Sequence, residues 1–169
     1  GATVPDPPRV DLTVPSRGSG LVLAELEVAP GSYGGAAFAA ADIEALGRAT
    51  RGGVTKRFAW TFASPTYFDD CERVVDVTDD AEASFQIAVR GELLFSLGQG
   101  TDEPRFAFEH FAAADADGDG FIERRELEAV RELPRGIESA RIGDLWEWLV
   151  ALSRGVATLD GGGCRVTWF

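Results

Sequence analysis

Five carboxylates and two glycines fall within the twelve residues DADGDGFIERRE, at positions 115–126 of a 169-residue chain. The first three acids stand at alternate positions, and Gly120 follows the third of them. Oxygen ligands with this spacing can converge on one hard cation, because a glycine permits the sharp bend that residues with a Cβ resist. Glu126 is long enough to reach back from a following helix. The spacing therefore predicts a cation site made by one short loop.

Calcium is the ion that this donor set suits best, since it takes six to eight oxygen ligands in a flexible arrangement. We expect Phe121 to contribute its backbone carbonyl and Glu123 to bind directly or through a water molecule. Glu126 binds with both carboxylate oxygens. The complete set of predicted metal ligands is Asp115, Asp117, Asp119, Phe121, Glu123 and Glu126.

The segment from about residue 104 to 133 resembles the EF-hand family of calcium-binding proteins. The loop matches the pattern D-x-D-x-D-G with glutamate twelfth, and Ile122 stands eighth, where the family keeps an aliphatic residue. Phe108 and Phe111 before the loop have the spacing of a helix face. The resemblance implies a helix–loop–helix with Ca2+ as its cofactor. The alternative, an acidic surface turn between two helices, requires neither the alternating acids nor the glycine sixth.

A second loop of this kind does not occur in the sequence. The stretch DVTDDAEASFQI has alanine sixth and isoleucine twelfth, and DGGGCRVTWF lacks the later acids. The hand is therefore predicted to be solitary, and its Ile122 edge packs on its own chain, including the third helix, or pairs with a second chain. The chain has no methionine, whereas calcium sensors typically open a Met-rich groove, so we expect a structural ion.

The first half of the chain has the alternating pattern of half-buried strands. Phe58, Trp60 and Phe62 share one predicted face, which we assign to the core. Short strands separated by glycine, proline and aspartate turns are typical of an antiparallel sandwich. The predicted strands cover residues 10–14, 21–30, 54–62 and 81–89.

Beyond residue 102 the pattern becomes helical, with one helix on each side of the loop and the second stopped by Pro134. A third helix is predicted at about 139–155, followed by a last strand, CRVTWF. Trp146 and Trp148 are two apart, so we expect one to be buried and the other partly exposed. The fold class is α+β: an antiparallel β-sandwich with an EF-hand and one further helix inserted before the last strand.

Two units are predicted within one compact body. Residues 1–98 plus 163–169 form the β-sandwich, and residues 102–158 form the helical segment with its single EF-hand. The two cysteines, Cys71 and Cys164, lie in no CxxC or Cys/His cluster. They pair as a disulfide in an oxidising compartment, or stay two buried thiols in a cytosolic protein.

The formal charge of -12 favours cations and argues against nucleic acid or an anionic membrane surface as a partner. No apolar run approaches the ~18 residues of a membrane span. The sequence does not begin with methionine, as expected after removal of a signal segment or trimming of the chain. A lipid anchor upstream is left open, as is the choice between monomer and dimer.

The stretches ELEVAPGSYGGAAF, VTKRFAWTF and CRV are similar to small secreted or lipid-anchored bacterial proteins in which a sandwich precedes one EF-hand. This resemblance implies an extracytoplasmic protein, whether periplasmic, cell-surface or secreted. We expect non-enzymatic calcium binding. Two alternatives are kept: a calcium-dependent binding or adhesion module for an unknown protein or glycan, and a hydrolytic enzyme with a cleft between the halves. For an enzyme, the candidate groups are His110 and the aspartate doublets at 69–70 and 79–80.

Overall fold

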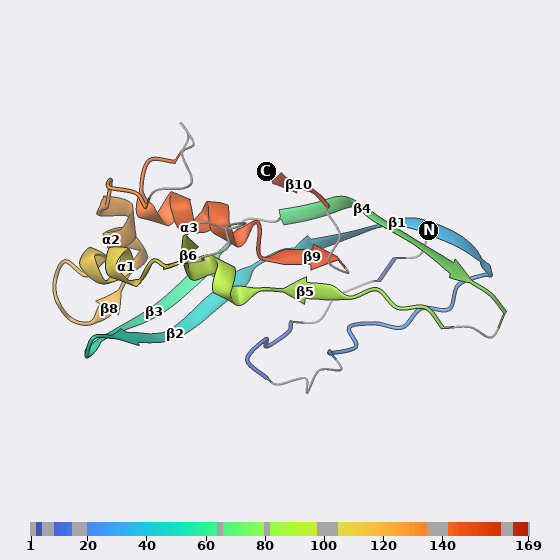
Figure 1. Cartoon of the computed structure of the whole chain (residues 1–169), viewed down its shortest axis with the longest axis horizontal. Helices are drawn as coiled ribbons and strands as arrows, with labels where there is room; N and C mark the ends of the chain where they lie inside the picture. Colours follow the sequence, from blue (N-terminus) through green and yellow to red (C-terminus); the bar gives the residue numbers. More distant parts are fainter. Residues whose placement is uncertain are drawn as a thin grey trace.

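The computed structural model describes residues 3–4, 9–14, 20–63, 66–79, 82–97, 105–134, 142–159 and 164–168. The molecule is elongated, with the α-helices gathered at one end and long strands running to the other (Figure 1). Strands outnumber helices among the described elements. The α+β class predicted from the sequence is confirmed.

The described strands form several small sheets. Two sheets have three strands each, and two have a single pair. All pairings are antiparallel except that of β3 with β8, which is parallel. The first three-stranded sheet has the spatial order β1 (Gly31–Ala40), β4 (Thr66–Val77) and β10 (Arg165–Trp168). The second has the order β2 (Ile43–Arg51), β3 (Val54–Phe62) and β8 (Phe121–Ile122). The two pairs are β5 (Ile87–Val89) with β9 (Ala157–Leu159), and β6 (Ser96–Leu97) with β7 (Arg105–Phe106).

The helices of the described segments are short. They are α1 (Phe108–Ala114), α2 (Arg124–Ala129) and α3 (Leu145–Ser153), with a 3₁₀ turn η1 (Gly91–Phe95). Helix α2 ends at Ala129, earlier than the predicted stop at Pro134, because Val130 already has extended backbone angles. Helix α3 begins after Asp144, whose carboxylate accepts from the Glu147 N–H and caps it; the first part of its predicted range, 139–141, lies outside the described residues. No helix among the described residues has the length and apolar character needed to cross a membrane.

Two of the predicted strands are wrong. Residues 11–14 make a turn closed by Asp11, which accepts from the Thr13 N–H at 2.9 Å, and residues 21–29 join no described sheet. Val22 is accordingly 77% exposed. The strand forms later instead, as β1, immediately after the predicted range 21–30. Alternation in the sequence predicts an apolar face, but it does not predict which strand pairs with which. Both edges of β4 are already occupied, one by β1 and the other by β10. The predicted strand at 81–89 is reduced to β5.

The main core lies between β3 and the helices. Trp60 and Phe62 are buried there, which confirms the predicted aromatic face. Phe62 stacks on Trp146 with ring centroids 5.1 Å apart, and Phe111 lies 6.0 Å from Trp148. Both tryptophans are therefore buried, and the prediction that one of them is partly exposed is wrong. Helix α3 is covered on two sides, so residues on different faces both find aromatic partners.

A second, smaller core surrounds the disulfide. Cys71 on β4 is bonded to Cys164, just before β10, and closes a sequence separation of 93 residues. Phe68, Ala157 and Leu159 complete this cluster, to which β5 and β9 contribute. The predicted pairing is confirmed, and a disulfide of this kind indicates an oxidising environment.

Candidate metal centre

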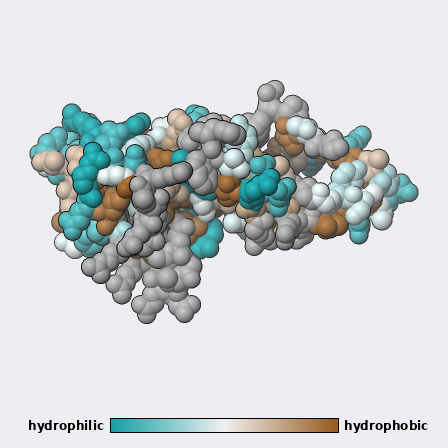
Figure 2. All heavy atoms as spheres, turned by 90° about the horizontal axis from the view of Figure 1, so that it is seen from above, coloured by the Kyte–Doolittle hydropathy of each residue, from teal (hydrophilic) through white to brown (hydrophobic). Residues whose placement is uncertain are grey.

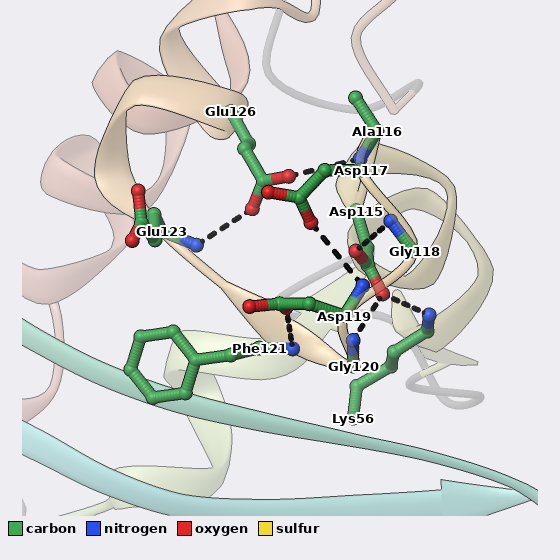
Figure 3. Close-up of polar contacts among 10 residues, drawn as sticks. All are labelled: Lys56, Asp115, Ala116, Asp117, Gly118, Asp119, Gly120, Phe121, Glu123 and Glu126. Carbon is green, nitrogen blue, oxygen red and sulfur yellow. Dashed lines mark hydrogen bonds and ion pairs between the residues drawn. The ribbon is translucent and has the colours of Figure 1, made fainter.

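The acidic loop, residues 115–126, leads from α1 into α2 and contains β8. Its bends are made by Gly118 and Gly120, whose φ angles of +75° and +78° lie in the left-handed region that favours glycine. The loop aspartates bind the backbone that follows them: Asp115 Oδ1 accepts from the Gly118 N–H at 2.9 Å, and its Oδ2 accepts from the Gly120 N–H at 3.0 Å. These contacts curl the chain around its own carboxylates, as Figure 3 shows.

Three carboxylates converge inside the acidic loop. Asp115, Asp117 and Glu126 each place one oxygen so that the three atoms lie within 4.8 Å of one another (Figure 3). Oxygens that bind one calcium ion at about 2.6 Å cannot be farther apart than about 5.2 Å. The spacing of the three oxygens therefore fits ligands of a single ion without a change in the course of the backbone.

Glu126 joins the two ends of the acidic loop. Its Oε1 accepts from the Ala116 N–H and its Oε2 from the Glu123 N–H, both at 2.9 Å. The residue is 7% exposed. A carboxylate offers about four lone-pair sites, so each oxygen keeps one for a cation. This arrangement favours the bidentate role predicted for Glu126.

The other predicted ligands lie in the acidic loop but outside this group of three oxygens. Asp119 accepts from the Phe121 N–H at 2.6 Å. Glu123 is ion-paired with Arg125, and its carboxylate points away from the three converging oxygens (Figure 3). Phe121 belongs to β8. Coordination by Asp119 and Glu123 requires their side chains to turn about χ1 and χ2.

Lys56, which the sequence prediction missed, enters the centre from β3. Its Nζ forms an ion pair with Asp115 Oδ2; the Asp115 side chain is fully buried and that of Lys56 is 16% exposed. The Lys56 hydrogen bond holds the pKa of Asp115 below its ordinary value, against the burial of the carboxyl group; the N–H groups of Gly120 and Gly118 act in the same direction as Lys56. One sequence signal was present: Lys56 has the same parity along the strand as Trp60 on the core face.

Strand β3 also covers the backbone edge of the acidic loop. Arg57 donates its N–H to the Gly120 carbonyl at 2.9 Å, and Trp60 Nε1 donates to the Ile122 carbonyl at 2.9 Å. Phe58 is the register partner of Ile122, which is 2% exposed. Of the two arrangements left open by the sequence, this edge therefore packs on its own chain, against β3.

Arginines near the acidic loop bind acids. Arg125 pairs with Glu123 and lies 3.7 Å from Asp117, and Arg124 pairs with Glu128 at 2.7 Å. Hydrophilic residues cover much of the helical end, at the left of Figure 2. The centre is thus an acidic loop within a charged surface.

No protein-family model, curated protein or solved structure matches this chain. The acidic loop contains only hard oxygen donors, the kind that calcium and magnesium prefer, and no thiolate or imidazole. Within the described parts of the chain, no other group of three or more His, Cys, Asp or Glu side chains is close enough to hold a metal ion.

Proposed function

We propose that this protein is a non-enzymatic calcium-binding protein in which one EF-hand, with its loop at residues 115–126, holds a structural ion. The convergence of Asp115, Asp117 and Glu126 is the observation that carries the proposal. Asp119 and Glu123 turn toward the ion when it binds, and the Phe121 carbonyl completes the shell. The ion relieves the repulsion among carboxylates that lie within a few ångströms of one another.

A structural role is supported by how firmly the acidic loop is packed. Ile122 and Leu127, on either side of the loop's end, are 2% and 0% exposed. The edge that pairs with a second loop in a paired EF-hand is bonded to β3 instead. Because this edge and the adjoining helix face are already covered, the hand has little apolar surface to present on binding calcium. The ion then holds α1 and α2 against the sheet.

The proposed setting is extracytoplasmic, that is periplasmic, cell-surface or secreted. The Cys71–Cys164 disulfide supports it, since such bonds persist in oxidising environments. Extracellular EF-hand modules bind calcium at roughly 10⁻⁴ to 10⁻³ M, and we expect this range here. The proposal also keeps the two predicted units. Residues 1–98 and 163–169 form an antiparallel β-sandwich, and residues 102–158 form the helical segment.

Calorimetric titration of the oxidised protein with calcium, and separately with magnesium, tests the proposal. We expect one calcium site per chain and weaker binding of magnesium, because magnesium demands a smaller octahedral shell and gives up its water reluctantly. The Glu126→Gln variant is expected to lose the site. Absence of calcium binding by the wild-type chain at millimolar concentrations would contradict the proposed function.

A further inference from the structure

Lys56 supplies a positive charge to the acidic loop from outside it. The residue lies on β3, fifty-nine positions before Asp115, and its Nζ reaches the Asp115 oxygen that faces the strand (Figure 3). It is the only lysine of the chain. When no divalent ion is present, the ammonium group of Lys56 therefore supplies a positive charge to the carboxylates of the loop.

The ammonium group and a divalent ion compete for the same carboxylate. Asp115 Oδ2 accepts from both Lys56 Nζ and the Gly120 N–H, whereas Oδ1 accepts only from the Gly118 N–H. A carboxylate oxygen has about two lone-pair sites, so Oδ2 is fully used, whereas Oδ1 keeps one site for an ion. An ion bound to Oδ1 shares one buried carboxylate with the ammonium group of Lys56. Two positive charges a few ångströms apart also repel each other in a partly buried site.

Departure of Lys56 is sterically simple. Its side chain is a flexible four-carbon stem with a strongly hydrated head group, which keeps its charge in water when the stem stays packed. Lys56 stands near the start of β3, close to the β2–β3 turn at Gly52 and Gly53, and already retains 16% exposure. A rotation of the stem carries Nζ into solvent without a movement of the strand.

We propose that Lys56 is a tethered competitor of the divalent ion: it occupies Asp115 in the ion-free protein, keeps the acidic loop folded, and is displaced when calcium enters. This inference rests on the proposed function. Its consequence is a calcium affinity lower than that of the same loop without the lysine. It also means that the ion-free loop is already shaped for binding, with the charge of Asp115 neutralised by Lys56.

Among the described residues, Arg125 is the other cation that contacts predicted ligands, and its ion pairs are much more exposed. Its side chain is 71% exposed, and its partners Glu123 and Asp117 are 42% and 54% exposed. Ion pairs that are so exposed to water contribute little to stability, and salt screens them. The buried contact of Lys56 with Asp115 is therefore the one that a bound ion must break.

Calcium titration of Lys56→Gln, with Arg57→Gln as control, tests the competition. Arg57 is next along the strand, and its substitution by glutamine removes the same charge. The Arg57 guanidinium lies over the Phe121 ring, 5.8 Å from the centroid. We expect Lys56→Gln to bind calcium about tenfold more tightly, the scale expected for loss of a charged hydrogen bond. The control is expected to change affinity by less than about twofold. Equal shifts in the two variants, or weaker binding by Lys56→Gln, would overturn the inference.

Thermal unfolding in chelator and in saturating calcium measures the stability of the ion-free and the ion-bound protein separately. Lys56→Gln should melt below the wild type in chelator and close to it in saturating calcium, since only the ion-free state uses the lysine. A variant that melts equally far below the wild type in both conditions would show a merely structural role for Lys56 and would count against competition.

Amine labelling of the wild-type protein needs no variant. Acetylation of Lys56, followed by mass spectrometry of its peptide, is expected to be several times faster in calcium than in chelator, with the N-terminal amine as internal reference. An unchanged or slower rate in a protein that binds calcium refutes displacement while the proposed function stands. If the wild type binds no calcium in the titration, the proposed function fails first.

Discussion

The indole nitrogen of Trp60 donates a hydrogen bond of 2.9 Å to the backbone carbonyl of Ile122. This bond joins a core side chain of β3 to the middle of the acidic loop. Trp60 is 3% exposed, and its ring also lies 5.8 Å from that of Phe111 on α1. The position of the loop is thus fixed from inside the core as well as by its own acids.

Trp60→Phe should weaken calcium binding as well as stability. The substitution keeps an aromatic ring but leaves the buried Ile122 carbonyl without its donor, which costs about 1 to 3 kcal/mol. Calcium titration and urea unfolding measure the two effects. Phe62→Leu is the control, because Phe62 packs on Trp146 of α3 rather than bonding the loop. We expect the control to lose stability with no change in calcium affinity, and equal losses of affinity in both variants would contradict the prediction.

Calcium should raise the melting temperature through the loop carboxylates. An ion that binds only the folded chain, supplied at 100 times its Kd, adds about 2.7 kcal/mol to stability. Glu126→Gln and Asp115→Ala are each expected to abolish this rise. Glu128→Gln should keep it, because Glu128 lies on the same helix but pairs with Arg124. Differential scanning calorimetry with calcium and with chelator measures the change; identical curves for the wild type in both would refute the prediction.

Gly120→Ala should destabilise the protein by about 1 to 2 kcal/mol, the cost of a left-handed backbone for a residue with a Cβ. Gly120 has φ +78°, and its added Cβ would stand 3.9 Å from the Thr55 carbonyl, so the cost arises from the backbone and not from a clash. Gly91→Ala is the control, since Gly91 lies outside the left-handed region and has no atom within 4 Å of a Cβ. Chemical unfolding in chelator should rank Gly120→Ala clearly below both the wild type and Gly91→Ala.

Loss of the Cys71–Cys164 bond should destabilise the protein without removing the calcium site. A disulfide that closes a loop of this length contributes up to ~4 to 5 kcal/mol in the chain-entropy model. Its surroundings, with Phe68 and Leu159, form a cluster separate from the core that holds Ile122. The double variant Cys71→Ser/Cys164→Ser should therefore melt lower yet bind calcium within about twofold of the wild type, as expected for distant sites. A large loss of affinity would show that the two cores are coupled.

Local spacing was enough to predict that Asp115, Asp117 and Glu126 converge, because all three lie within twelve consecutive residues. The strand face of Trp60 and Phe62 was predictable for the same reason, since period-two alternation is a local property. The pairing of Cys71 with Cys164 was one of two alternatives that the sequence left open, the other being two buried thiols. Each of these predictions needed no knowledge of which strands lie side by side.

The features that were missed depend on tertiary partners. β9 follows α3 directly and became a strand because β5 lies beside it, while residues 21–29 alternate well yet join no described sheet. Trp146 and Trp148 are both buried because α3 has aromatic neighbours on two sides. Lys56 reached Asp115 only because β3 pairs with β8. Periodicity predicts which residues share a face, but it does not predict which element packs against that face.

The parallel contact between β3 and β8 joins segments about sixty residues apart, as the separation of 62 between Trp60 and Ile122 shows. Contacts of such long sequence separation are slow to form, because the intervening chain must first be ordered. The ion site itself is local, but its attachment to β3 depends on this contact. An ion that stabilises the attached loop therefore stabilises the native state more than a transition state in which the contact has not formed. Calcium is therefore expected to lengthen the lifetime of the folded protein by slowing its unfolding, with little influence on how fast the chain folds.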